Sequence, residues 1–258
     1  MGMTIGDMKV GSMLQLGKYG ISNDDPKPII WLKATPNSDF ITLNTVDYLC
    51  FDAREPSGTE WRYVGNPNYK LSNIHNFLNS DDEDWFAQTH PADEPPSRMF
   101  VSKRQFAYDR HFGFLYHFEE FELESIKPET FEVDGELITS KMRLPSLENI
   151  TGVNHFKVFS KKGIRPHATE DMLYTRVFTY ESYIPFWLND RLHGGFVAVM
   201  GRKGTLERQF ASDCSGLRPV CTIKQDTPVL KQDGVYYIEP RAIQYCTDGE
   251  LFALLGIA

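Results

Sequence analysis

The sequence predicts an α+β fold in which many short strands accompany one or two helices. Short apolar runs broken by Gly, Pro, Asn and Asp recur along the whole chain, as they do in antiparallel strands. Helical periodicity is confined to a few short segments. Aromatic residues make up 13% of the 258 residues, which suits a compact core containing β-structure. We expect one domain that spans residues 1–258.

The clearest strand candidates lie in residues 8–54. Four apolar runs in this range predict a β-meander: GSMLQLGKYG, KPIIWLKAT, DFITLNT and DYLCFDA. A helix is predicted over residues 71–79, with Ser72 as the residue that caps its first turn. On this helix Asn73 and Asn76 should be largely exposed. Four side chains at helical spacing should be buried: Leu71, Ile74, Phe77 and Leu78.

The second half of the chain mixes strands with short helical segments. Asp134-Gly135 predicts a type I′ hairpin turn, because both central residues of such a turn need a positive φ. A short helix should begin at Ser146, and a weaker helical or mixed region covers residues 102–126. Further strands are expected within residues 155–220 and 228–258. The domain should also carry an insertion at about 87–130 and a C-terminal strand extension at about 225–258.

Charge and hydropathy exclude several classes of protein. A formal net charge of −8 lacks the basic footprint of a protein that binds a phosphate backbone, so we expect no nucleic-acid partner. No apolar run approaches the roughly 20 residues of a membrane span, and no secretion signal opens the chain. We therefore expect a protein that is made in the cytoplasm and does not insert into a membrane.

Motifs for catalysis and metal binding are weak. The seven histidines are scattered, and hydrolase and phosphate-loop motifs are missing from the sequence, so we expect no enzyme and no cofactor. The acidic run at 81–84 has oxygen ligands that suit Ca²⁺ but lacks the spacing of a calcium loop, and we predict no metal. A bridge between Cys214 and Cys221 across a hairpin stays open. We expect buried thiols at four positions: Cys50, Cys214, Cys221 and Cys246.

Five motifs follow one another along the chain: PIIWLKA, YKLSNIHNFLN, LPSLE, PFWLND and GLRPV. In this order they resemble an uncharacterised domain family common in prophages and in surface proteins of Gram-positive bacteria. The similarity covers roughly residues 14–224. The family often has Arg-x-Trp-Leu-Asn where this chain has His75, Phe77, Leu78 and Asn79. Its W-L-R-S strand is W-L-N-D here, without the arginine, whereas its closing G-V-R-P is nearly intact as G-L-R-P.

The resemblance implies a C-type-lectin-like fold, distantly akin to formylglycine-generating enzymes and to phage variable receptor-binding proteins. In that fold the closing Gly-apolar-Arg strand belongs to the core, and its arginine is held by backbone carbonyls. The residues with this structural role here are Trp187, Gly216, Arg218 and Pro219. A formylglycine generator needs two nearby cysteines in one groove. The odd separation of Cys214 and Cys221 would instead point them to opposite faces of an extended strand.

Lectin-like folds present a recognition surface on the loops before the closing strand, which are residues 189–196 and 201–213 here. These loops combine basic, polar and aromatic side chains on an otherwise acidic chain, and such a contrast of charge can steer a partner. The candidate binding residues are Asn189, Asp190, Arg191, His193, Arg202, Lys203, Arg208, Gln209 and Phe210.

The leading hypothesis is a non-enzymatic structural or binding protein of a phage or prophage-like particle. It would be an accessory tail, baseplate, fibre or capsid-surface component, located in the virion and assembled in the host cytoplasm. Its partners would be other virion proteins or a host cell-surface ligand, and a homo-oligomer is expected. The alternative is a bacterial carbohydrate- or peptide-binding lectin-like module. The third hypothesis is an oxidase like the formylglycine generators.

Overall fold

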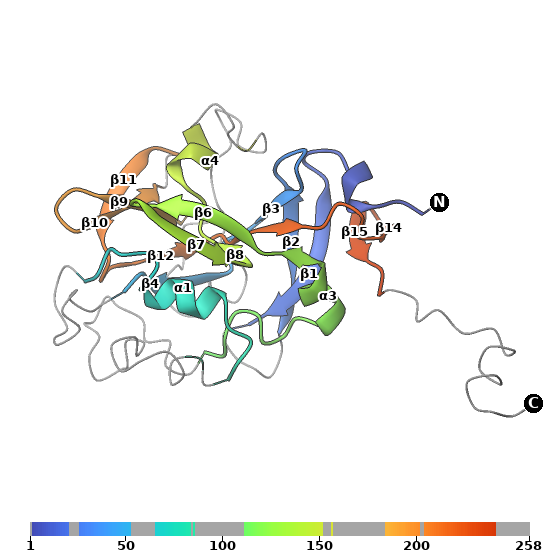
Figure 1. The fold of residues 1–258 in the computed structure, drawn as a ribbon, viewed down its shortest axis with the longest axis horizontal. Helices are drawn as coiled ribbons and strands as arrows, with labels where there is room; N and C mark the ends of the chain where they lie inside the picture. The colour runs from blue at the N-terminus through green and yellow to red at the C-terminus, as the bar shows by residue number, and fades with distance from the viewer. Residues whose placement is uncertain are drawn as a thin grey trace, which may run out of the picture.

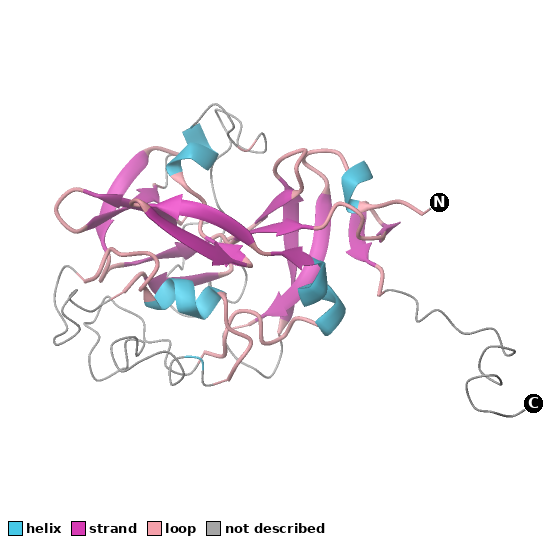
Figure 2. Cartoon of the chain, viewed as in Figure 1, coloured by secondary structure: helices cyan, strands magenta, loops and turns pink. Residues whose placement is uncertain are grey.

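Strands dominate the structure, a computed structural model shown in Figures 1 and 2. The structure describes residues 2–20, 26–52, 65–83, 85, 111–151, 156, 184–201 and 204–240. These residues contain fifteen strands, three short α-helices and one 3-10 helix. The predicted α+β, C-type-lectin-like class is therefore wrong, and the fold is mostly β with mixed sheets. Helical periodicity lasts for only a turn or two, so α1 (Asn73–Leu78) and α3 (Glu120–Ser125) have six residues each.

The larger sheet has eight strands and contains both ends of the described chain. Its order is β14 (Val229–Gln232), β15 (Val235–Ile238), β1 (Met13–Tyr19), β2 (Lys27–Lys33), β3 (Asp39–Thr42), β13 (Val220–Ile223) and β5 (Ile126–Lys127), and β8 (Met142–Arg143) also pairs with β13. β15 runs parallel to β1, whereas the other pairs are antiparallel. The described part of the predicted C-terminal extension is thus an integral part of this sheet.

The second sheet has five strands and carries the candidate binding loops. Its order is β11 (Leu206–Phe210), β10 (Phe196–Met200), β9 (Phe186–Leu192), β12 (Cys214–Leu217) and β4 (Asp47–Cys50). β12 runs parallel to β9, and Gly216 lies opposite Phe186. A Cβ on Gly216 would lie 2.5 Å from the Thr45 side chain and 2.9 Å from the Pro185 carbonyl, so only glycine fits this approach.

The third sheet is a hairpin of β6 (Glu129–Val133) and β7 (Glu136–Ser140). Its turn confirms the prediction at Asp134-Gly135, because the two residues have φ values of 54° and 80°. In Figure 1 this hairpin extends toward the five-stranded sheet, and β6 contacts β9. The strands predicted in residues 8–54 are likewise confirmed as β1 to β4.

The helices are short, and two of them begin directly after the serines Ser72 and Ser146 of the sequence prediction. The 3-10 helix η1 covers Ile5–Asp7, and the α-helices are α1 (Asn73–Leu78), α3 (Glu120–Ser125) and α4 (Leu147–Thr151). The Ser72 hydroxyl accepts a hydrogen bond from the His75 amide, and the Ser146 hydroxyl accepts one from the Asn149 amide, so both predicted N-caps are confirmed.

The burial predicted for α1 is partly wrong. Ile74, Phe77 and Leu78 are fully buried as predicted, but Leu71 is 47% exposed and Asn73 is buried. Leu71 precedes the N-cap and does not belong to the buried face of the helix. The Asn73 amide donates to the carboxylate of Asp52, so the first turn packs against the chain beyond β4.

One large hydrophobic cluster draws side chains from both sheets, including Trp31 of β2 and Trp187 of β9. A second cluster lies on the other face of the five-stranded sheet, where Ala198 and Met200 join Phe186. The predicted limits of a single domain stay a prediction. Within the described residues, no helix is both long enough and apolar enough to span a bilayer.

Candidate functional site

The segments predicted as binding loops, residues 189–196 and 201–213, are largely strand, because they contain the end of β9, the start of β10 and all of β11. The β9–β10 turn contains His193, Gly194 and Gly195, and both glycines have a positive φ, of 79° and 81°. This tight turn pairs the start of β10 with the end of β9, and on the other side of β10 Phe196 lies opposite Phe210 of β11. Arg202 and Lys203, two of the predicted binding residues, lie outside the described residues.

Two phenylalanines and an arginine form the most distinctive contact in this region. The rings of Phe196 and Phe210 are stacked, with centroids 4.4 Å apart and an interplanar angle of 19°. The Arg208 guanidinium lies 4.5 Å from the Phe196 centroid, within the range of a cation–π interaction. Leu206 lies on the same face of β11 because side chains two residues apart point the same way, and it is 47% exposed.

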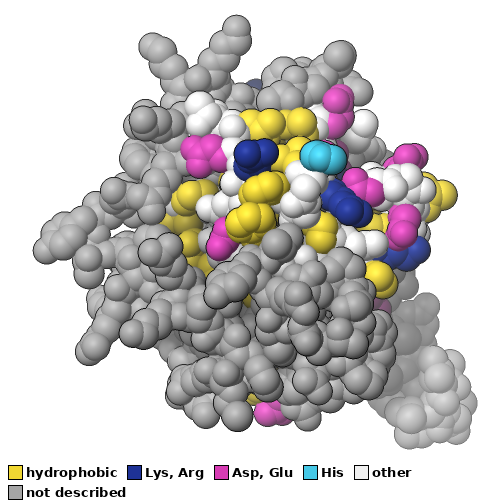
Figure 3. Space-filling view, turned by 90° about the vertical axis from the view of Figure 1, so that its left-hand side faces the viewer, with side chains coloured by type: hydrophobic (Ala, Val, Ile, Leu, Met, Phe, Trp, Pro, Cys, Tyr) yellow, Lys and Arg dark blue, Asp and Glu magenta, His cyan; other side chains and the backbone are white. Residues whose placement is uncertain are grey.

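We call Phe196, Leu206, Arg208 and Phe210 the hairpin face. β11 is the outermost strand of its sheet among the described residues, so the face borders a strand edge. The view in Figure 3 looks onto this end of the molecule, where hydrophobic side chains lie beside lysine or arginine, histidine and acidic side chains. Sequence analysis missed Phe196 and Leu206. The alternation of Leu206, Arg208 and Phe210 could have placed Leu206 on this face, whereas the position of Phe196 depends on the pairing of β10 with β11.

Asn189 and Asp190 have structural partners and do not belong to the hairpin face. The Asn189 backbone amide donates to the Pro145 carbonyl at 3.0 Å, and its side chain is buried. The Asp190 carboxylate accepts from the Leu147 amide at 2.6 Å, at the first residue of α4. Burial raises the pKa of Asp190, although this amide lowers it in part. The LPSLE and PFWLND motifs of the sequence are therefore in contact and are joined by hydrogen bonds.

The remaining predicted binding residues divide into exposed and partnered groups. Arg191 and His193 are exposed beside the β9–β10 turn. Arg191 also lies near enough to Asp134 to lower the pKa of that carboxyl, although burial raises it more. Gln209 accepts a hydrogen bond from the Ser215 hydroxyl at 2.6 Å, which ties β11 to β12. Arg191 and His193 are thus the two predicted residues that can extend the hairpin face.

The motif residues at the closing strand are parts of the scaffold. Arg218 is buried and donates from Nε to the Thr42 carbonyl at 3.1 Å and from Nη2 to the Leu43 carbonyl at 3.1 Å. Its guanidinium also lies 5.3 Å from the Phe186 ring centroid. Burial lowers the pKa of Arg218 to about 10. Pro219 follows it, and the Pro219 carbonyl accepts from the Thr42 amide at 3.2 Å.

Trp187 is a second anchor of the scaffold. Its ring is fully buried, its indole N–H donates to the Leu49 carbonyl at 2.9 Å, and the Phe51 ring lies edge-on at 5.5 Å. β9 is thereby fixed to β4 across the width of β12. Since the tryptophan of the PFWLND motif points into the core, it is not part of the hairpin face.

Cys214 and Cys221 lie on different sheets, whereas Cys214 lies opposite Cys50 of β4. Cys214 lies on β12 of the five-stranded sheet, whereas Cys221 lies on β13 of the eight-stranded sheet. Both are buried and neither forms a disulfide, so the bridge that the sequence left open is not made. Burial raises the pKa of Cys221, which disfavours the thiolate needed for redox or metal chemistry.

Within the described residues, no three histidine, cysteine or acidic side chains are grouped as ligands for a metal ion. Asp81, Asp82 and Glu83 belong to the part of the acidic run that is described, and Asp84 lies outside it.

A buried polar cluster that sequence analysis missed joins Tyr19, Asp47 and His111. The Tyr19 hydroxyl donates to Asp47 Oδ2, and His111 Nδ1 lies 3.2 Å from the same oxygen. The Tyr48 amide donates to Asp47 Oδ1 at 2.6 Å. Burial and the neighbouring Asp47 raise the pKa of Tyr19. The cluster connects β1, β4 and the segment before α3, and positions so distant in the chain carry no common sequence signal.

Comparison of the chain with protein-family models, with curated proteins and with solved structures finds no match. The geometry of the described residues is therefore the basis on which a function can be argued.

Proposed function

We propose that this protein is a non-enzymatic binding protein that uses the hairpin face to hold a neighbouring copy of itself. The observation that carries the proposal is the stacked Phe196–Phe210 pair with Arg208 over it, beside the edge of β11. Aromatic and arginine side chains supply much of the binding energy at protein interfaces. An open strand edge offers backbone groups to a second strand.

A second copy fits the charge of this surface. Arg208 is an exposed cation on a chain with a formal net charge of −8, so another copy supplies acidic groups in excess. Opposite charges steer such an encounter and favour one orientation. Homo-oligomers usually form closed, symmetric assemblies.

The resemblance to a prophage domain family supports placing this assembly in a phage or prophage-like particle. There the chain would be an accessory tail, baseplate, fibre or capsid-surface component that contacts other virion proteins or a host surface. The burial of all three described thiols favours this role over the oxidase hypothesis, because an oxidase of that class needs two accessible thiols in one groove.

Light scattering coupled to size-exclusion chromatography and negative-stain imaging of the full chain test the proposal. We expect the wild-type protein to form a defined oligomer, and Arg208→Glu and Phe210→Ser each to reduce it to the monomer. Lys9→Glu makes the same change of charge at an exposed residue beside η1 and should leave the oligomer intact. A wild-type chain that stays monomeric at all concentrations would overturn the proposal. A monomer that binds a glycan array through Phe196 and Phe210 would establish the carbohydrate-binding alternative.

A further inference from the structure

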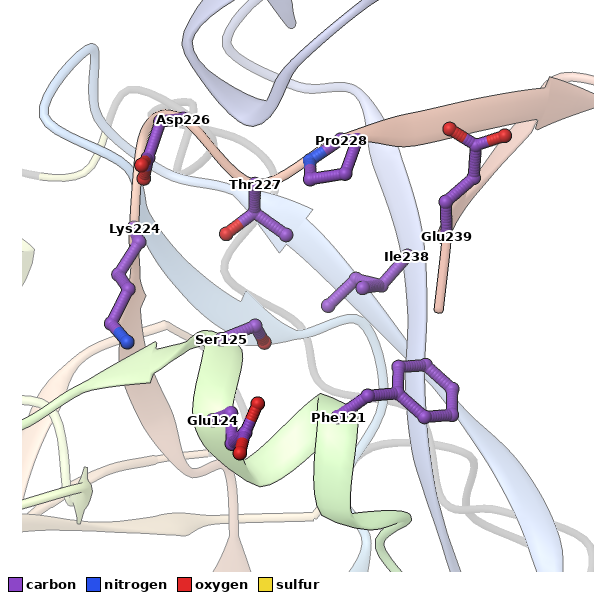
Figure 4. Close-up of a pocket in the computed structure, with 9 residues that line it drawn as sticks. All are labelled: Phe121, Glu124, Ser125, Lys224, Asp226, Thr227, Pro228, Ile238 and Glu239. Carbon is purple, nitrogen blue, oxygen red and sulfur yellow. The ribbon is translucent and has the colours of Figure 1, made fainter. Parts of the chain in front are cut away.

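A cavity of about 340 Å³ lies between α3 and the ends of β13 and β15, on the side of the eight-stranded sheet (Figure 4). Ser125, Thr227 and Ile238 line this cavity, and all three are buried. Phe121 of α3 supplies an aromatic wall (Figure 4). A cavity of this volume is at the lower end of the range that holds a small molecule or one side chain.

Backbone hydrogen bonds hold the walls of this cavity in place. The Lys224 amide donates to the Ser125 carbonyl at 2.9 Å, which joins the loop after β13 to α3. The Ile5 amide donates to the Thr227 carbonyl at 2.9 Å, and the Glu239 amide donates to the Pro228 carbonyl at 3.1 Å. Because these bonds tie together four separate segments, the cavity is preformed and does not need a ligand to create it.

The rim of the cavity carries an excess of negative charge. Glu124, Asp226 and Glu239 are three carboxylates against the one ammonium of Lys224, so the formal charge is −3 + 1 = −2. Within the described part of the chain, none of these four groups forms an ion pair. In Figure 4 the side chains of Glu124 and Lys224 lie on the same side of the cavity. The charges are therefore available to a ligand.

A neighbouring cavity of about 430 Å³ has no excess of charge among its lining residues. Its two lysines and two acidic residues balance, and Lys127 is already paired with Glu129 at 2.7 Å. Its Asp39 accepts hydrogen bonds from Thr35 and Thr222. Charges that are matched within the protein offer little selectivity for an ionic ligand.

We propose that the cavity beside α3 binds an organic cation, an ammonium or guanidinium group on a short apolar stem. The stem would pack on Phe121 and Ile238, and the cation would lie between the rim carboxylates. This site lies on the eight-stranded sheet, apart from the hairpin face, so it goes beyond the proposed assembly function and does not depend on it.

Nuclear magnetic resonance titration of the full chain, labelled with ¹⁵N, tests this site with n-butylammonium and n-butyrate. We expect n-butylammonium to shift the amide signals of Phe121, Thr227 and Ile238 with a millimolar dissociation constant, and n-butyrate to leave them unchanged. Glu124→Gln should weaken n-butylammonium binding about threefold, the effect expected for one partly exposed charge. The matched change Glu129→Gln, at the neighbouring cavity, should leave binding unchanged.

A parallel titration with the peptide acetyl-Gly-Lys-Gly-amide distinguishes two sources of the cation. Tighter binding of the peptide than of n-butylammonium assigns the site to a basic side chain of a partner protein, and weaker binding assigns it to a free amine. Equal shifts with n-butyrate, or n-butylammonium binding that Glu124→Gln does not weaken, would overturn the proposal. The outcome of this titration does not depend on whether Arg208→Glu and Phe210→Ser change the oligomeric state.

Discussion

The carboxylate of Asp190 accepts a hydrogen bond from the backbone amide of Leu147 at 2.6 Å, across 43 positions of the chain. The bond places a negative charge at the start of α4, where the backbone N–H groups lack partners within the helix. A second bond fixes the turn at Pro145 against β9, because the preceding residue, Asn189, donates its backbone amide to the Pro145 carbonyl. A residue that the sequence assigned to binding therefore acts in folding.

Asp190→Ala should lower the free energy of unfolding by about 1–2 kcal/mol, since it leaves the Leu147 amide, the first of α4, without its capping acceptor, while Ser146 still accepts from the Asn149 amide. Asp190→Asn keeps an acceptor and should cost less. Urea denaturation followed by circular dichroism measures both variants. Glu132→Ala deletes an exposed carboxylate of β6 and should change stability by less than about 0.5 kcal/mol. Equal effects at both positions would contradict the capping role.

The stability of the protein should fall between pH 6.5 and pH 4 because of His75. Burial lowers the pKa of this imidazole from 6.5 to about 4, which outweighs the opposing effect of the Lys70 backbone. The unfolded chain therefore binds a proton in this range that the folded chain does not. The contribution is fully present above pH 6.5 and is lost as the pH falls, by up to about 3 kcal/mol.

Urea denaturation at a series of pH values measures this slope. His75→Leu should flatten it, whatever its effect on stability at neutral pH, because the titrating group is gone. His193→Gln removes an exposed histidine and should leave the slope as in the wild type. A His75→Leu curve parallel to that of the wild type would show that His75 does not titrate differently on folding.

Asp47→Ala should be among the most destabilising single changes in the chain. It would leave the Tyr19 hydroxyl, His111 and the Tyr48 amide without the buried carboxylate that they contact, at a cost of about 3–5 kcal/mol. Tyr19→Phe removes one donor and should cost about 1–2 kcal/mol. Tyr116→Phe is the control, because Tyr116 is 40% exposed. Thermal and urea unfolding measure all three, and a neutral Asp47→Ala would refute the role of the cluster.

The thiols of Cys50, Cys214 and Cys221 should react slowly in the native protein. All three are buried, and a thiol reagent reaches a buried sulfur only after local opening of the structure. A Cys246→Ser variant removes the cysteine that lies outside the described residues. Titration of this variant with 5,5′-dithiobis(2-nitrobenzoate) should show little labelling in buffer and three thiols in denaturant. Rapid labelling of Cys214 and Cys221 would support the oxidase hypothesis.

Local features of the fold were predictable from the sequence. The strands of residues 8–54 follow from apolar runs interrupted by turn residues, and Asp134-Gly135 predicts its hairpin because few other pairs adopt positive φ at both positions. Ser72 and Ser146 cap their helices through hydroxyls that accept from the third helical residue. The prediction at Leu71 was wrong because periodicity locates a helical face but not the residue at which the helix begins.

The sequence by itself determined the positions of strands, turns and caps, since these depend on residues close together in the chain. Only the tertiary structure decided how the strands divide between sheets, which separated Cys214 from Cys221. It also turned Asp190 into a helix cap, and brought Phe196 and Arg208 together on the hairpin face. The physical reason is the same in each case. Pairing between distant strands depends on the burial of both partners at once, and no local pattern encodes that.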